Sequence, residues 1–151
     1  MPRVPLVPAD TDDAVLRPIF DRVRAQGVDV PTLYLALGNA PDVLSAWTRM
    51  AWPLRTKPTS ARWLRELVIL RVAQLTGAAY EWQHHRTMAL GAGVSTDQID
   101  ALHDWQAHST FDDLTRACLV VTDELALGTS VSDGAFAELA QLCPPSELVE
   151  L

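Results

Sequence analysis

The sequence has 151 residues, which is enough for one domain with a substantial hydrophobic core. Its composition, 48% hydrophobic and 21% charged, is typical of a globular protein, and its net charge of −7 argues against a nucleic-acid partner because no basic stripe could neutralise phosphates. The two cysteines, Cys118 and Cys143, are too few and too widely spaced for a disulfide scaffold or a zinc site. Cys118 lies in an apolar run and is expected to be buried.

The first third of the chain is punctuated by prolines. Residues 1–10 carry three of them at intervals of three, which predicts an extended arm rather than a helix. A helix is expected over residues 12–26, either kinked or started at Pro18. Further prolines predict a short helix over residues 31–37 and another over residues 41–52, followed by a loop.

The densest apolar run of the chain extends from Trp63 to Leu75. Apolar residues fall on nearly every side of its helical projection, which predicts a helix buried all round, with Thr59 or Ser60 as its cap. Glu66 lies within this run, and a buried carboxylate must be paired, hydrogen-bonded or protonated. An ordinary ion pair with Arg62, four residues earlier, would also satisfy it.

A second helix is predicted from about Ala78 to Leu90, and it carries the acid and base groups. On it Glu81 and His85 share one face, so that a carboxylate and an imidazole lie within reach of each other. We therefore take Glu66, Glu81 and His85 as candidate catalytic residues. The candidate substrate-binding residues around them are Trp63, Tyr80, Trp82, Met88 and His84. Each assignment has an alternative. Glu81 and His85 could be an exposed ion pair on one helix that takes part in no reaction, and His84 could lie at the surface or at an interface. The large apolar side chains could simply belong to the core.

The last third of the chain has clear helix signals. A helix over residues 95–107 starts with a capping box formed by Ser95 and Gln98. The next is expected over residues 112–127, and Ser132 should cap a third. No segment alternates like a strand, so the sequence predicts an all-α bundle without a sheet.

One segment carries a family resemblance. Residues 65–85, RELVILRVAQLTGAAYEWQHH, resemble the signature of the carboxymuconolactone decarboxylase family, which includes the alkylhydroperoxidase D proteins. The thiol members of that family have a Glu, eleven residues, Cys-x-x-Cys, three residues and a His. On this chain Glu66 takes the Glu position, Ala78 and Glu81 take the two cysteine positions, and His85 takes the His position. The resemblance implies the all-α, alkylhydroperoxidase D-like helical bundle.

The missing Cys-x-x-Cys motif separates the possible activities. Alkylhydroperoxidase or peroxiredoxin-type antioxidant activity needs paired thiols, and here neither position holds sulfur. The resemblance then implies a lyase like the decarboxylases proper, which would use general acid/base proton transfer to decarboxylate or isomerise a small lactone or aromatic-derived organic acid. In that mechanism His85 would be the general acid or base, Glu81 would orient it, and Glu66 would bind substrate or act as a second acid. A non-catalytic, oligomeric small-molecule-binding protein of the same fold is the alternative.

No cofactor is expected, and no metal, although Glu66, Glu81 and His85 could conceivably share an ion. The apolar helix predicts a homo-oligomer, and the resemblance implies a trimer or hexamer. The sequence shows neither a signal peptide, in which charged residues precede an apolar segment, nor an apolar run of about 18 residues. We therefore expect no membrane partner and a cytoplasmic location. Residues 1–151 are expected to form a single domain, and the helix that starts at Pro144 is expected to be truncated at residue 151.

Overall fold

The computed structural model describes residues 2–151, so that of the predicted arm only Met1 lies outside the described residues. Within that range the protein has helices and no strand, and the prediction of an all-α fold is confirmed. The helices are α1 (Leu16–Arg24), α2 (Thr32–Leu37), α3 (Pro41–Thr56), α4 (Arg62–Thr76), α5 (Ala79–Gly91), α6 (Thr96–Ala101), the 3₁₀ helix η1 (Leu102–Ala107), α7 (Asp113–Gly128), α8 (Asp133–Leu142) and α9 (Pro145–Glu150). The chain divides into two compact units, one ending at Lys57 and one running from Pro58 to Leu151. That the whole chain forms a single domain stays a prediction.

In the first unit, α1 begins later than the sequence pattern indicates. The Oδ1 atom of Asp13 accepts hydrogen bonds from the backbone N–H groups of Val15 and Leu16, both at 2.9 Å, and so satisfies two donors where α1 begins. The helix starts at Leu16, so Pro18 is its third residue and lies in the first turn, where its missing N–H leaves no intrahelical hydrogen bond unmade. Residues 2–10 contain no helix, and the backbone N–H of Val7 donates to the carbonyl oxygen of α2 residue Leu35.

Helix α3 is longer than predicted, because Pro53 lies inside it rather than ending it. The last turn is fastened by its side chains: the guanidinium of Arg55 lies 5.6 Å from the Trp47 ring centroid, and its Nη1 donates to the Tyr34 hydroxyl at 3.2 Å. The guanidinium of Arg22 similarly lies 5.4 Å from the centroid of the Trp52 ring. The end of α3 is therefore tied to side chains of α1 and α2 as well as to its own Trp47.

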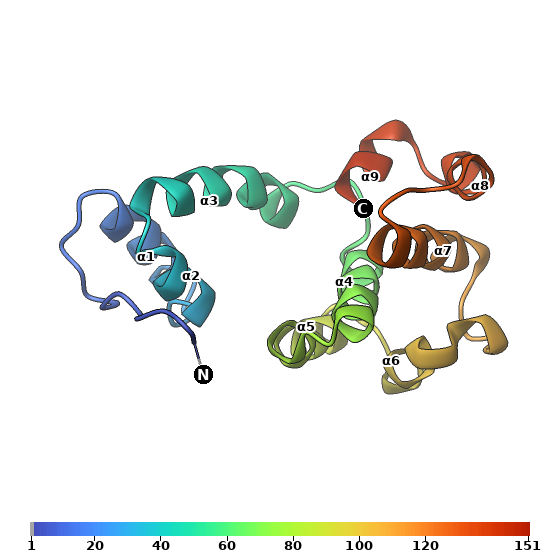
Figure 1. Cartoon of the computed structure of the whole chain (residues 1–151), viewed down its shortest axis with the longest axis horizontal. Coiled ribbons are helices and arrows are strands. Elements are labelled where there is room, and N and C mark those ends of the chain that lie inside the picture. Colours follow the sequence, from blue (N-terminus) through green and yellow to red (C-terminus); the bar gives the residue numbers. More distant parts are fainter. Residues whose placement is uncertain (1) are drawn as a thin grey trace. The chain divides into compact units, whose positions relative to one another are not determined.

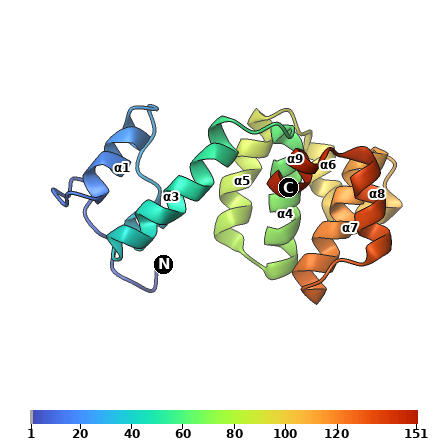
Figure 2. The ribbon, with the colours of Figure 1, turned by 90° about the horizontal axis from the view of Figure 1, so that it is seen from above.

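The second unit is built on α4, which lies between α5 and α7 (Figures 1 and 2). Leu64, Leu67 and Leu70 of α4 are 1% exposed or less, and burial of each such side chain contributes about 1.5–3 kcal/mol. The prediction that this helix is buried all round is wrong, because Val72 is 38% exposed and Val68 is only partly buried. These two valines border an apolar cavity of about 420 Å³ that α7, α8 and α9 also line.

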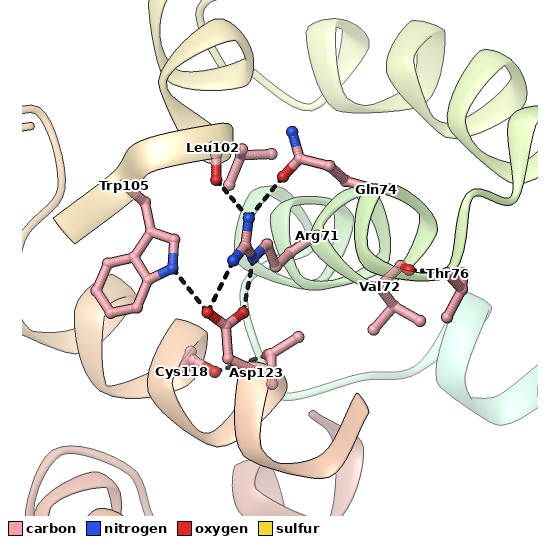
Figure 3. A network of polar contacts seen from close by, with 9 residues as sticks. Arg71, Val72, Gln74, Thr76, Leu102, Trp105, Cys118 and Asp123 are labelled. Atoms are coloured by element: carbon pink, nitrogen blue, oxygen red, sulfur yellow. Dashed lines mark hydrogen bonds and ion pairs between the residues drawn. The ribbon is translucent and has the colours of Figure 1, made fainter. Parts of the chain in front are cut away.

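A buried ion pair joins α4 to α7 (Figure 3). Arg71 donates from Nε and Nη2 to the two carboxylate oxygens of Asp123, at 2.6 and 2.8 Å. Its Nη1 donates to Gln74 Oε1 and to the carbonyl oxygen of Leu102, and the indole N–H of Trp105 donates to Asp123 at 3.1 Å. Every nitrogen of the guanidinium is therefore satisfied, as a cation that is only 7% exposed requires.

The start of α4 differs from the prediction that Thr59 or Ser60 caps it. The N-cap residue is Ala61, which has no side-chain acceptor. Thr59 and Ser60 instead donate their backbone N–H groups and hydroxyls to the Glu150 carboxylate of α9, over distances of 2.7 to 3.2 Å. This long-range contact holds a terminal helix that is too short to be stable alone.

The remaining helix signals are mostly confirmed. Ser95 and Gln98 form the capping box, and the Ser132 hydroxyl accepts the N–H of Ala135 at the start of α8. The helix predicted to reach residue 107 is α-helical only to Ala101, and residues 102–107 form η1, which is kinked at Asp104, a residue with non-helical backbone angles. Within residues 2–151, every helix is too short or too polar to cross a lipid bilayer.

Candidate active site

The contact between α4 and α5 brings the first two candidate residues together. Oε2 of Glu66 lies 2.8 Å from Nδ1 of His85, although the two residues are nineteen positions apart. Both side chains are largely enclosed, with exposed fractions of 6% and 13%. The requirement that a buried Glu66 have a partner is therefore met by an imidazole, and the pair is shielded enough for its hydrogen bond to be strong.

Glu81 approaches the other side of the same imidazole. Its Oε2 lies 3.4 Å from Nε2 of His85, at the spacing of one helical turn along α5. The Glu81 side chain is 40% exposed, in contrast to Glu66. His85 thus has an enclosed carboxylate at Nδ1 and a solvent-facing carboxylate at Nε2, so that each ring nitrogen has a group with which it can exchange a proton.

Arg62 belongs to this group of charges. Its Nε donates to Oε1 of Glu66 at 3.5 Å, the oxygen that His85 does not contact. The ion pair with Arg62 and the contact with His85 are therefore not alternatives, since Glu66 makes both. The Arg62 side chain is 56% exposed, and within residues 2–151 its two terminal nitrogens have no hydrogen-bond partner.

The expected aromatic wall is divided among three places. Tyr80, His84 and Met88 line a hollow of about 460 Å³ along α5, together with Gln83 and Thr87. Trp82 lines a separate hollow of about 290 Å³ near the end of α4 and packs on the core, and Trp63 packs against the core clusters.

Glu66, Glu81 and His85 do not line the hollow along α5, but His84, which does line it, contacts the His85 ring. The His84 ring stacks on Tyr80 with centroids 6.0 Å apart, and it meets the His85 ring edge-on at 5.6 Å. Gln83 and Thr87 were missed as lining residues, although their positions, three and seven residues after Tyr80, place them on the same helix face and could have indicated them.

Thiol chemistry has no support at this site. Ala78 and Glu81 occupy the positions where thiol members have cysteines, and the cysteines of this chain lie elsewhere, in the cluster that joins α7 to the end of α8. Cys118 is 2% exposed, and its burial, with smaller contributions from Cys143 and nearby carboxylates, raises the pKa of its thiol to about 12. A thiol with that pKa is almost entirely protonated at neutral pH and is a poor nucleophile. Among the described residues, no group of three or more His, Cys, Asp or Glu side chains is placed to share a metal ion.

Comparison with known proteins identifies the family. The model of the carboxymuconolactone decarboxylase family matches residues 41–124, more than half of the chain, and that range contains Glu66, Glu81 and His85. No curated protein matches the sequence significantly. The family match and the all-α fold agree with the resemblance seen in residues 65–85. The chain belongs to the carboxymuconolactone decarboxylase family.

Proposed function

We propose that this protein is an enzyme that moves protons on a small lactone or aromatic-derived organic acid, as a decarboxylase or isomerase does. The observation that carries the proposal is the contact of 2.8 Å between the enclosed Glu66 carboxylate and Nδ1 of His85, with Glu81 at Nε2. A carboxylate that fixes one nitrogen of an imidazole sets the ring orientation and leaves the other nitrogen to act as general acid or base.

The distances favour a division of roles that reverses the expected one. Glu66 is closer to His85 than Glu81 is, and it is more buried. We therefore propose that Glu66, rather than Glu81, orients the imidazole. Glu81 is more exposed and lies beside Nε2, where it can stabilise the imidazolium and take part in returning protons from solvent.

The two reactions use Nε2 of His85 in different protonation states: as a proton donor in the imidazolium, and as a proton acceptor in the neutral ring whose proton is on Nδ1. In a decarboxylation, the bond to the departing carboxyl carbon breaks, carbon dioxide leaves, and the electron pair that stays behind takes the proton from Nε2. In an isomerisation, Nε2 removes a proton from a carbon next to a carbonyl group and returns it to another carbon. Both need a site that can stabilise the developing negative charge, which a positioned imidazolium does.

The experiment is a turnover screen in D₂O with small lactone acids and aromatic acids, followed by proton NMR for carbon dioxide loss, isomer formation and deuterium incorporation. We expect turnover by the native protein and a loss of about 10²–10⁴-fold in His85→Asn, the usual contribution of a general acid or base. His103→Asn is the matched control, because the exposed His103 contacts Asp104 and the carbonyl oxygen of Asp100 and lies outside the candidate site. Equal turnover by the native protein and His85→Asn, or ligand binding without any turnover, would overturn the proposal, and the latter would favour a binding protein of the same fold.

The enzyme is proposed to work as a homo-oligomer. Apolar side chains stay exposed around the cavity between α4, α7 and α8, including Val72 at 38%, Leu125 at 51% and Phe136 at 53%. Exposed apolar surface of this kind commonly marks a protein interface. Sedimentation at micromolar concentration should give a mass that is a multiple of 16.6 kDa, and a monomer at that concentration would contradict the proposal.

A further inference from the structure

Arg62 is the cation next to the acid and base groups whose terminal donors are unused. Its guanidinium touches Glu66 through Nε only, at 3.5 Å, and Glu66 in turn contacts His85 at 2.8 Å, so a single carboxylate separates the guanidinium from the imidazole. Arg71 and Arg65 have their donors occupied, because Arg71 is engaged by Asp123 and Arg65 donates to Ser60. Arg86, which follows His85 on α5, forms no ion pair within residues 2–151 but, unlike Arg62, does not contact Glu66.

The charges of the site make such a cation necessary for an acidic substrate. Glu66 and Glu81 place two carboxylates around His85, and the whole chain carries a net charge of −7. A substrate anion that approached His85 would be repelled by both carboxylates unless a positive group held it. A guanidinium with two terminal nitrogens available can bind a carboxylate through two parallel hydrogen bonds.

We propose that Arg62 is a substrate-binding residue that recognises a carboxylate of the substrate, an inference that rests on the proposed function. Arg62 is more than half exposed, so its terminal nitrogens can reach an incoming ligand while Nε stays near Glu66. The carboxylate that Arg62 binds is one that the substrate keeps. A departing carboxyl group must lose its negative charge to the neighbouring carbon, and a guanidinium bound to it would stabilise the reactant over the transition state.

The test compares ligands that differ only in charge. The probes are 5-oxotetrahydrofuran-3-carboxylate and its carboxamide, with benzoate and benzamide as an aromatic pair, and their dissociation constants are measured by calorimetry on the full chain. In Arg62→Gln we expect binding of the carboxylates to weaken by roughly 10- to 100-fold, the usual effect of losing a hydrogen-bonded charge pair, while the amides bind as before. Arg62→Lys should retain part of the preference, because it keeps the charge and loses the planar fork.

Arg86→Gln is the matched control, since Arg86 follows His85 on α5 and forms no ion pair within residues 2–151. Equal weakening of acids and amides in Arg62→Gln would show that Arg62 acts only by holding Glu66, and would overturn the inference. The inference would also be overturned if Arg86→Gln, rather than Arg62→Gln, weakened the binding of the carboxylates, or if the native protein bound the acids and the amides equally well. Turnover and binding, measured together, separate the two proposals. A preference for carboxylates without turnover by the native protein supports Arg62 as the binding residue and refutes the reaction. Turnover that is lost in His85→Asn, without a preference for carboxylates, supports the reaction and refutes the role of Arg62.

Discussion

The buried ion pair between Arg71 and Asp123 offers the sharpest test of what holds the second unit together. Asp123→Asn keeps the size of the side chain and removes its charge. The guanidinium of Arg71, 7% exposed, would then keep its bonds to Gln74 and Leu102 but lose the carboxylate that balances its charge (Figure 3). Removing one partner of a buried pair costs about 3–5 kcal/mol, because the remaining charge stays buried.

Urea unfolding at pH 7, followed by far-UV circular dichroism, measures this cost as a change in the free energy of unfolding. The same loss corresponds to a decrease of about 6–20 °C in Tm for a protein of this size. The matched control is Asp21→Asn, which breaks the exposed pair between Asp21 and Arg24 at 3.0 Å and should cost about 0–1 kcal/mol.

A double variant separates the charge from the packing. Arg71→Met combined with Asp123→Leu replaces both charges by apolar groups of similar volume and should recover part of the stability lost in Asp123→Asn. If Asp123→Asn were no more destabilising than Asp21→Asn, the reasoning that a satisfied buried pair fastens α4 to α7 would be refuted.

Three further predictions concern local contacts. The hydrogen bonds from Ser60 and Thr59 lower the pKa of Glu150 to about 2, so the stabilisation by Glu150 should be present above pH 4.5 and lost as the pH falls towards 2. The difference in unfolding free energy between the native protein and Glu150→Ala should therefore decrease between these two pH values and vanish at the lower one. Cys118, with its pKa of about 12, should react with a thiol reagent at pH 8 far more slowly in the native than in the urea-unfolded protein, and equal rates would contradict its burial. Ser95→Ala should lower the free energy of unfolding by about 1 kcal/mol through loss of the capping box, whereas Thr96→Ala should change it little.

Local signals in the sequence predicted the helices well, because the groups that start a helix are close in sequence. Ser95 and Ser132 cap their helices as expected. The errors have a common cause, which is that a distant contact overrides the local signal. Pro53 stays inside α3, whose last turn is fastened by side-chain contacts to earlier residues, and Ser60 bonds to Glu150, ninety positions away, instead of capping α4.

Some contacts of the candidate site could be predicted from the sequence, and others could not. The contact between Glu81 and His85 follows from their spacing along one helix. The contact between Glu66 and His85 joins two helices, so the spacing could not predict it. The sequence grouped Glu66 with the other two because it is an acid within a buried run next to their helix, and the family resemblance supported that grouping. The pair of Arg71 and Asp123, fifty-two positions apart, had no sequence signal at all.

The most direct test of the central claim is the tautomer of His85, read from nitrogen-15 NMR of its imidazole in the native protein and in Glu66→Gln. A ring held by the Glu66 carboxylate at 2.8 Å should carry its proton on Nδ1 when neutral. Glu66→Gln should shift the neutral ring towards the Nε2-protonated form, while the spectrum of His103, which lies outside the site, stays unchanged. A neutral His85 that is protonated on Nε2 in the native protein, with a spectrum insensitive to Glu66→Gln, would contradict the account.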